Sequence, residues 1–195
     1  MSDYDALLQL ARQRRSPYAF DADAPVSDDA LGRVFEVARW APSSYNEQPW
    51  RFLVGRRGDP AYGAVAGALQ GRNPEWAPTA PVLGVVFITE AFAQGGKDNA
   101  HALFDAGAAC FGLALAAQAE GLGVHFMAGI DAGAVQALAP DGVRAVAGFA
   151  LGRPAADPRA VVPGDLADRA LQPKPRRPLS ETVFGPSWGE PAVGD

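Results

Sequence analysis

Residues 82–89 have the sequence VLGVVFIT, and residues 102–119 have the sequence ALFDAGAACFGLALAAQA. The first stretch is a continuous apolar run of strand length, which predicts a buried strand at the centre of a sheet. The second lies within a long helix predicted over residues 99–120, which ends at two glycines, Gly121 and Gly123. A helix that is apolar on most faces must be covered on most faces, so a second subunit is a candidate for part of the cover.

A membrane span is the alternative for residues 102–119, which hold a single charged residue, Asp105. Their length is at the short end of what a span needs. They are also rich in alanine rather than in leucine and isoleucine, and they contain Asp and Gln. We therefore interpret them as a buried helix of a soluble protein.

Further elements are predicted on both sides of this pair. A helix over residues 27–40 begins at Ser27, whose hydroxyl is a favourable N-cap, and Asp131 is the expected N-cap of another helix. Together the elements describe a mixed α/β chain of one domain without internal repeats. The remaining helices are predicted over residues 3–13, 61–69 and 132–138, and the remaining strands over residues 50–54, 124–128 and 143–151.

Composition excludes several classes of protein. The 195 residues are 48% hydrophobic and 20% charged, so the chain can build a core and is not intrinsically disordered. A net charge of −5 with scattered Arg and Lys argues against binding to nucleic acid or to an anionic membrane. The single cysteine, Cys110, and the distant His101 and His125 predict neither an internal disulfide nor a metal site. No signal peptide is evident, so we expect a cytoplasmic protein.

The last part of the chain, residues 153–195, is rich in proline and shows no sustained periodicity. A disordered tail is expected to lack large apolar residues, whereas this one holds several. We therefore predict an extended arm that packs on another surface. The apolar residues are Leu166, Leu171, Leu179, Val183, Phe184 and Trp188.

Two groups of cations have more than one interpretation. Arg14, Arg15 and Ser16 follow the first helix and suit a phosphate, but cations near a helix C-terminus also complement its dipole. In the tail, residues 174–179 (KPRRPL) place three cations in four positions between prolines, and the alternative there is a solvated basic patch. Taken alone, neither group decides between the two interpretations.

Two further segments are candidates for contact with a ligand, one through polar side chains and one through its backbone. Residues 41–50 (APSSYNEQPW) present short polar side chains between prolines, which suits a polar uncharged ring as well as ordinary turns. A predicted strand ends at Ala128 and Gly129, where the backbone can approach a ligand closely. His125 is more simply explained as a core histidine than as a catalyst. The chain has no Ser-His-Asp arrangement, no phosphate-binding GxxxxGK[ST] loop and no GxGxxG after a strand, which indicates that a cofactor carries the chemistry.

In this order the elements resemble the nitroreductase family of FMN-dependent oxidoreductases. The most specific part is the run from Ala41 to Phe52, and the likeness spans about residues 4–185. It implies an α+β, nitroreductase-like fold with a mixed central sheet flanked by helices. It also implies an intertwined homodimer with two FMN sites, each built from both subunits. Residues 1–195 form one such domain, in which residues 153–195 are an arm on the partner subunit.

The resemblance also implies a role for each site residue. Arg14, Arg15 and Ser16 hold the FMN phosphate and ribityl chain, and Arg176, with Lys174 or Arg177 nearby, reaches the same phosphate. The partner subunit supplies the polar loop, and the flavin ring meets residues from two further segments. Asn73 hydrogen-bonds the pyrimidine edge of the flavin. The backbone of Ala128 and Gly129, beside Met127, faces N5 and O4. The loop residues are Pro42, Ser43, Ser44, Asn46 and Gln48.

Tyr18 departs from the family pattern, which commonly has Lys or Arg two positions after the motif serine, near flavin N1 and O2. A phenol can donate a hydrogen bond there but brings no positive charge. We therefore expect the anionic reduced flavin to be less stabilised, with a lower reduction potential or a slower hydride step.

The implied activity is hydride transfer from NADH or NADPH to flavin N5, followed by electron transfer to a small-molecule acceptor in ping-pong order. Nitroaromatics, quinones and enals are candidate acceptors, and no single side chain is expected to be catalytic. The alternatives are a narrower flavin reductase, dehalogenase or semialdehyde reductase of the same fold, a flavin-binding storage or regulatory protein with little turnover, and a dimer that has lost its cofactor.

Overall fold

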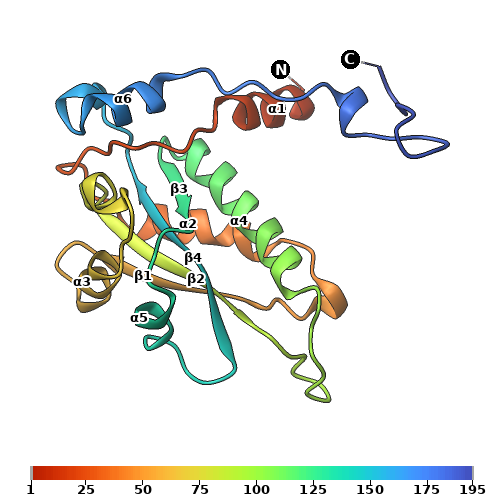
Figure 1. The fold of residues 1–195 in the computed structure, drawn as a ribbon, viewed down its shortest axis with the longest axis horizontal. Coiled ribbons are helices and arrows are strands. Elements are labelled where there is room, and N and C mark those ends of the chain that lie inside the picture. Colours follow the sequence, from red (N-terminus) through yellow and green to blue (C-terminus); the bar gives the residue numbers. More distant parts are fainter. Residues whose placement is uncertain (1, 195) are drawn as a thin grey trace.

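A four-stranded sheet with helices on both faces forms the body of the protein (Figure 1). The computed structural model describes residues 2–194, so Met1 and Asp195 of the predicted domain lie outside the described part. The helices are α1 (Asp3–Gln13), α2 (Asp28–Arg39), α3 (Pro60–Gly67), α4 (Ala102–Ala119), α5 (Ala132–Gln136) and α6 (Gly164–Leu171). The strands are β1 (Trp50–Arg56), β2 (Val82–Thr89), β3 (Gly123–Met127) and β4 (Val143–Gly152).

The sheet has the strand order β1-β2-β4-β3, and every pair of neighbours is antiparallel. The α+β class is confirmed, whereas the mixed sheet that we expected is antiparallel throughout the described chain. The reason lies in the strand order. β2 and β3 run in the same direction, but β4 lies between them, so each strand pairs only with strands that run the opposite way.

Strand β2 is buried on both faces, as its apolar run predicts. Leu83, Val85 and Phe87 contact a core that includes residues of α3, α5 and α6. Val82 and Val86 face a second core formed with α2 and α4. The alternation of side chains along a strand explains how one short run serves two cores.

Helix α4 is long and apolar enough to cross a membrane by length and composition alone, and 44% of it is buried within the protein. Its small residues pack toward the sheet and α2. The helix begins at Ala102 rather than at Asn99, because Asn99 forms a turn in which its side-chain oxygen accepts the backbone N–H of His101. Leu103, Phe104 and Phe111 remain exposed. One chain therefore leaves part of this apolar helix uncovered, as we expected.

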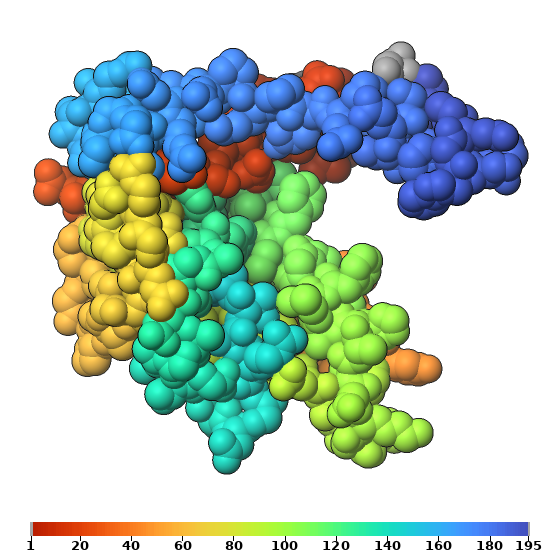
Figure 2. Space-filling view, viewed as in Figure 1, coloured from red at the N-terminus to blue at the C-terminus, as the bar shows by residue number. Residues whose placement is uncertain are grey.

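The tail contains a helix that the sequence analysis missed. In α6, Leu166 and Ala167 are buried against the sheet core, so residues 153–171 belong to the body of this chain and are not an extended arm. Eight residues are too few to show a sustained period. Beyond Leu171 the described chain has one short 3-10 helix, η5 (Leu179–Glu181), and projects from the body (Figures 1 and 2). Leu179 and Trp188 are exposed.

Candidate cofactor site

Two guanidinium groups from opposite ends of the sequence lie at one cavity. Arg14 caps the C-terminus of α1, and Arg176 comes from the tail; both line a cavity of about 440 Å³ whose wall is formed by α4 and β3. Burial, together with the positive charges of Arg176 and Arg15, lowers the pKa of Arg14. Within residues 2–194 neither Arg14 nor Arg176 forms an ion pair with a carboxylate. Two adjacent cations without a counter-ion favour an anionic ligand.

The neighbouring polar residues divide between this cavity and other places. Arg14 Nη1 lies 3.4 Å from Ser16 Oγ, so Ser16 stays beside the pair. Arg15 instead donates to the carbonyls of Arg12 and Arg14 and lines a separate cavity with Gln118 and Ala170.

The other tail cations have partners of their own. Lys174 Nζ donates to the carbonyl of Arg169 at 2.9 Å, and Arg177 pairs with Glu181 at 3.3 Å. Among the described residues, Arg176 donates to the carbonyls of Lys174 and Pro175 in its own segment and pairs with no carboxylate. Of the three cations that we named in the tail, Arg176 is the one that lines the cavity with Arg14.

Tyr18 belongs to an aromatic cluster with Trp76 and His125. Its ring lies edge-on to both, with centroid distances of 5.2 Å to Trp76 and 4.6 Å to His125. His125 Nδ1 lies 2.9 Å from the carbonyl oxygen of Pro17, which fixes the backbone just before Tyr18. Burial lowers the pKa of His125, an effect opposed by the bond to Pro17 and reinforced by Lys174, so the imidazole is neutral at pH 7. These contacts fit the interpretation of His125 as a packing residue.

Asn73 and Gly129 are in direct contact. Asn73 Nδ2 donates to the carbonyl of Gly129 at 2.8 Å, and Asn73 Oδ1 accepts the indole N–H of Trp76 at 3.1 Å. One amide N–H of Asn73 therefore remains for a ligand. Ala128, next to Gly129, is exposed just beyond β3, whereas the side chain of Met127 is buried.

Gly129→Ala is expected to disturb this contact, because an added Cβ would lie 2.7 Å from Asn73 Nδ2. The Asn73 side chain must move, and the bond to the Gly129 carbonyl weakens. We expect a loss of about 1–3 kcal/mol in the free energy of unfolding, measured by urea denaturation. Gly133→Ala is the matched control, since its Cβ would meet nothing closer than 3.4 Å. Equal stability of the two variants would show that the Asn73 contact is not tight.

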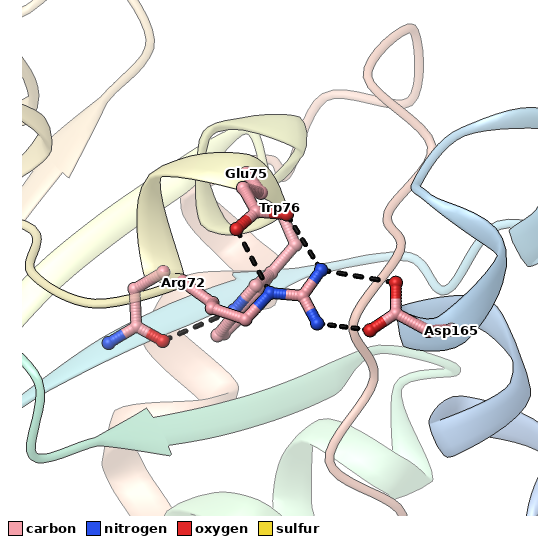
Figure 3. A network of polar contacts seen from close by, with 5 residues as sticks. Arg72, Glu75, Trp76 and Asp165 are labelled. Carbon is pink, nitrogen blue, oxygen red and sulfur yellow. Dashed lines mark hydrogen bonds and ion pairs between the residues drawn. The ribbon is translucent and has the colours of Figure 1, made fainter.

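A cluster of ion pairs ties the Asn73 turn to α6 (Figure 3). Arg72 lies between Glu75 and Asp165, and its guanidinium donates to both carboxylates. The hydrogen bonds to Glu75 and Asp165 raise the pKa of Arg72, although all three side chains are largely exposed. The cluster links the turn carrying Asn73 and Trp76 to the helix from which the tail departs. Sequence reasoning missed it because it did not predict α6.

The polar loop of residues 42–49 lies between α2 and β1; Tyr45 is exposed, residues 43, 44, 47 and 48 are half-buried, and Pro49 is buried. The side chains of Ser44 and Asn46 form no hydrogen bond within residues 2–194, and Pro42 and Asn46 are exposed. Pro42, Asn46 and Gln48 line a cavity of about 410 Å³ together with Trp40. Among the described residues, no hydrogen bond or ion pair joins this loop to Arg14, Asn73 or Gly129.

The predicted site residues thus form three groups in one chain: the Arg14–Arg176 cavity, the cluster around Tyr18, Asn73 and Gly129, and the loop of residues 42–49. Within residues 2–194, no group of three His, Cys, Asp or Glu residues is placed to hold a metal ion. The fold and the paired cations define a protein suited to bind an anionic organic cofactor.

Comparisons with known proteins identify the family. The sequence profile described as the nitroreductase family matches residues 11–62. A solved oxidoreductase containing FMN is 34% identical, with a TM-score of 0.83 over 95% of this chain and 92% of that one. A nitroreductase from Desulfovibrio desulfuricans, solved in complex with FMN, is 31% identical, with a TM-score of 0.72 over 93% of this chain and 96% of that one.

Among sequences, an oxygen-insensitive NADPH nitroreductase of Helicobacter pylori is 40% identical over 52 residues, which are 27% of this chain and 25% of that protein. A 15.4 kDa protein of Mycolicibacterium smegmatis, whose name states no function, is 35% identical over 72% of this chain and 99% of its own length. The chain belongs to the nitroreductase family.

Proposed function

We propose that the protein is an FMN-dependent oxidoreductase that takes hydride from NADH or NADPH and passes electrons to a small-molecule acceptor. The observation that carries the proposal is the pair Arg14 and Arg176, two guanidinium groups at one cavity that have no carboxylate partner among residues 2–194. An FMN phosphate carries between about −1.5 and −2 charges at neutral pH, which two guanidinium groups complement. The FMN-containing relatives support the same assignment.

The residues present fit FMN in distinct roles. Arg14 and Arg176, with Ser16 beside them, bind the phosphate, and Arg15 supports the turn through its bonds to backbone carbonyls. The remaining N–H of Asn73 suits an acceptor on the flavin ring. The backbone at the exposed Ala128, next to the half-buried Gly129, lets a planar ring approach closely.

The flavin, when bound, supplies the redox chemistry: nicotinamide reduces it and leaves, and a nitroaromatic, quinone or enal then takes the electrons in ping-pong order. The side chains bind and orient the reactants and exclude water, so the proposal needs no catalytic side chain. Double-mixing stopped flow tests this order. We expect bleaching of the flavin by NADH or NADPH alone and its recovery on addition of an acceptor. Bleaching only when both substrates are present would contradict the ping-pong order.

The proposal includes a homodimer whose partner supplies the loop of residues 42–49. Exposed apolar side chains on α1, α2 and α4 support it, because large apolar side chains that one chain leaves uncovered are a feature of interfaces. Within residues 2–194, the Ser44 hydroxyl and the Asn46 amide of this loop have no hydrogen-bond partner, and no hydrogen bond joins the loop to the Arg14–Arg176 cavity or to the cluster around Tyr18, Asn73 and Gly129. A cytoplasmic location is part of the same proposal. The exposed side chains are Leu7, Val37, Leu103, Phe104 and Phe111.

Tyr18→Arg is expected to raise the midpoint potential of the bound FMN by about 30 mV, which is about 1.4 kcal/mol for a two-electron couple. A guanidinium near the anionic reduced flavin stabilises it, whereas the phenol brings no charge. Potentiometric titration measures the change. Tyr18→Phe is the control, because it keeps a ring to pack against Trp76 and His125. An unchanged midpoint potential in Tyr18→Arg would contradict the role of this position.

Tyr18 also favours a second candidate function, a flavin-binding protein with little turnover. If the missing cation leaves the reduced flavin poorly stabilised, neither nicotinamide bleaches the bound flavin under stopped flow. In a narrower flavin reductase or dehalogenase, the reduced nicotinamide bleaches the bound flavin, but few of the electron acceptors offered are used. A profile of acceptors under steady-state turnover separates that case from a broad nitroreductase.

A further inference from the structure

We infer that Asp105 is a positioning residue that holds the loop of residues 42–49 in the shape that the FMN site needs. The inference rests on the proposed function, in which this loop contacts the flavin bound by the partner subunit. Asp105 lies in the first turn of α4, and its side chain is 4% exposed. Its Oδ2 accepts the backbone N–H of Ser44 at 3.0 Å.

The backbone of this loop is strained. Tyr45, Asn46 and Gln48 have φ angles of 52°, 57° and 51°, in the left-handed region. Asparagine adopts this conformation readily, but tyrosine and glutamine are disfavoured there. Such a conformation persists only where surrounding contacts hold it, and it is often found at ligand-binding sites.

Several contacts hold the loop, and they differ in how firmly they are anchored. At the end of the loop, the Pro49 carbonyl accepts the N–H of Thr89 at 2.9 Å and the Gln48 carbonyl accepts from Arg51 Nη1 at 2.8 Å, so β2 and β1 hold this end. Ser43 Oγ accepts the N–H of Gln48 at 3.0 Å, which is a contact within the loop itself. Glu47 accepts the N–H of Ala93 at 2.9 Å, on an exposed turn. Within residues 2–194, residues 43–47 have two hydrogen-bond partners outside the loop, and Asp105 is the buried one, whereas Ala93 is exposed.

The position of Asp105 is fixed by packing. Ala102, Ala106 and Ala109 of α4 lie against Trp50 and Ile88 in a buried cluster. A carboxylate in the first turn is also favoured by the helix dipole, and a hydrogen bond from N–H to a carboxylate is stronger than one to a neutral oxygen. Asp105 therefore transmits the rigidity of α4 to the backbone of Ser44.

The loop that Asp105 holds is equipped to bind a ligand. The Ser44 hydroxyl and the Asn46 amide have no hydrogen-bond partner within residues 2–194, so both are available. A loop that samples other shapes binds more weakly, because the apparent dissociation constant rises by the inverse of the competent fraction. Asp105 thus acts on FMN affinity without touching FMN.

The test is the FMN dissociation constant of Asp105 variants, measured by flavin fluorescence. In Asp105→Ala the Ser44 N–H loses its partner, and we expect the dissociation constant to rise about tenfold. Asp105→Asn retains an acceptor and is expected to fall between wild type and Asp105→Ala. Leu113→Val is the control, because it perturbs a buried residue of the same helix away from the loop; its dissociation constant is expected to stay within about twofold of wild type.

A second substitution separates positioning from general loss of stability. Tyr45→Gly removes the cost of the left-handed backbone, so Tyr45→Gly in the Asp105→Ala background is expected to recover part of the lost affinity. A dissociation constant within about twofold of wild type in Asp105→Ala, or no recovery in the double variant, would overturn the inference. The dissociation constant of Leu113→Val shows how much a packing defect in α4 alone changes FMN affinity.

Hydrogen exchange of the Ser44 and Gln48 amides tests the same inference without FMN. We expect the Ser44 and Gln48 amides to exchange faster in Asp105→Ala, while the protection of the α4 amides stays unchanged. Unchanged exchange at Ser44 would overturn the inference. If the wild-type protein binds no FMN, the proposed function fails, and these exchange rates still decide whether Asp105 holds the loop.

Discussion

Replacing both Arg14 and Arg176 by glutamine is expected to weaken FMN binding by about 100-fold or more, and each single replacement by about tenfold. A hydrogen bond to a charged group contributes about 1.5–3 kcal/mol, so the loss of one guanidinium contact to a phosphate accounts for each tenfold step. The two groups line a single cavity and, within residues 2–194, neither pairs with a carboxylate. An anion bound there would relieve their mutual repulsion.

The matched experiment uses riboflavin, which lacks the phosphate. Its dissociation constant is expected to change little in the double variant, whereas that of FMN rises strongly. Arg12→Gln removes one positive charge from the last turn of the same helix, where Arg12 is exposed, and is expected to leave FMN affinity within about twofold. An equal loss for riboflavin and FMN would contradict a phosphate role for Arg14 and Arg176.

Truncation after Leu171 is expected to abolish tight FMN binding and to weaken the dimer. The truncated chain keeps α6, whose Leu166 and Ala167 are buried in the body, so its far-ultraviolet circular dichroism is expected to stay close to that of the full chain. It loses Arg176 and the exposed apolar residues of the tail, which need a covering surface. Sedimentation velocity and FMN titration measure the two effects.

A shorter truncation after Val183 is the control for the tail. It keeps Lys174, Arg176 and Arg177 but removes the packed rings of Phe184 and Trp188, whose centroids are 4.8 Å apart. We expect it to weaken the dimer while retaining most of the FMN affinity at high protein concentration. Full flavin occupancy after truncation at Leu171 would show that the tail serves packing only.

The elements could be predicted from the sequence where the local signal is strong. The apolar run of β2 and the first helix have the predicted bounds, because a buried strand and a capped amphipathic helix are encoded by neighbouring residues. Helix α6 was missed because its eight residues owe their helix to the burial of Leu166 and Ala167. The antiparallel order of the sheet depends on pairings between distant segments, which local patterns do not report.

The site could be predicted only in part. The juxtaposition of Arg14 and Arg176 came from the family resemblance, because no periodicity relates residues so far apart. Asp105 did leave a signal, as the single charge in an otherwise uncharged helix, but that signal pointed only to a soluble helix. Its partner is a backbone N–H of Ser44, and such a contact leaves no trace in the identity of the partner residue.

The absorbance spectrum of the purified protein after equilibration with FMN and gel filtration, recorded before and after addition of NADH or NADPH under anaerobic conditions, tests the central claim most directly. The account predicts a yellow protein with flavin bands in the blue and near ultraviolet, retained through the column and bleached by a reduced nicotinamide. A protein that leaves the column without flavin would contradict FMN binding, and retained flavin that neither nicotinamide bleaches would contradict the proposed activity.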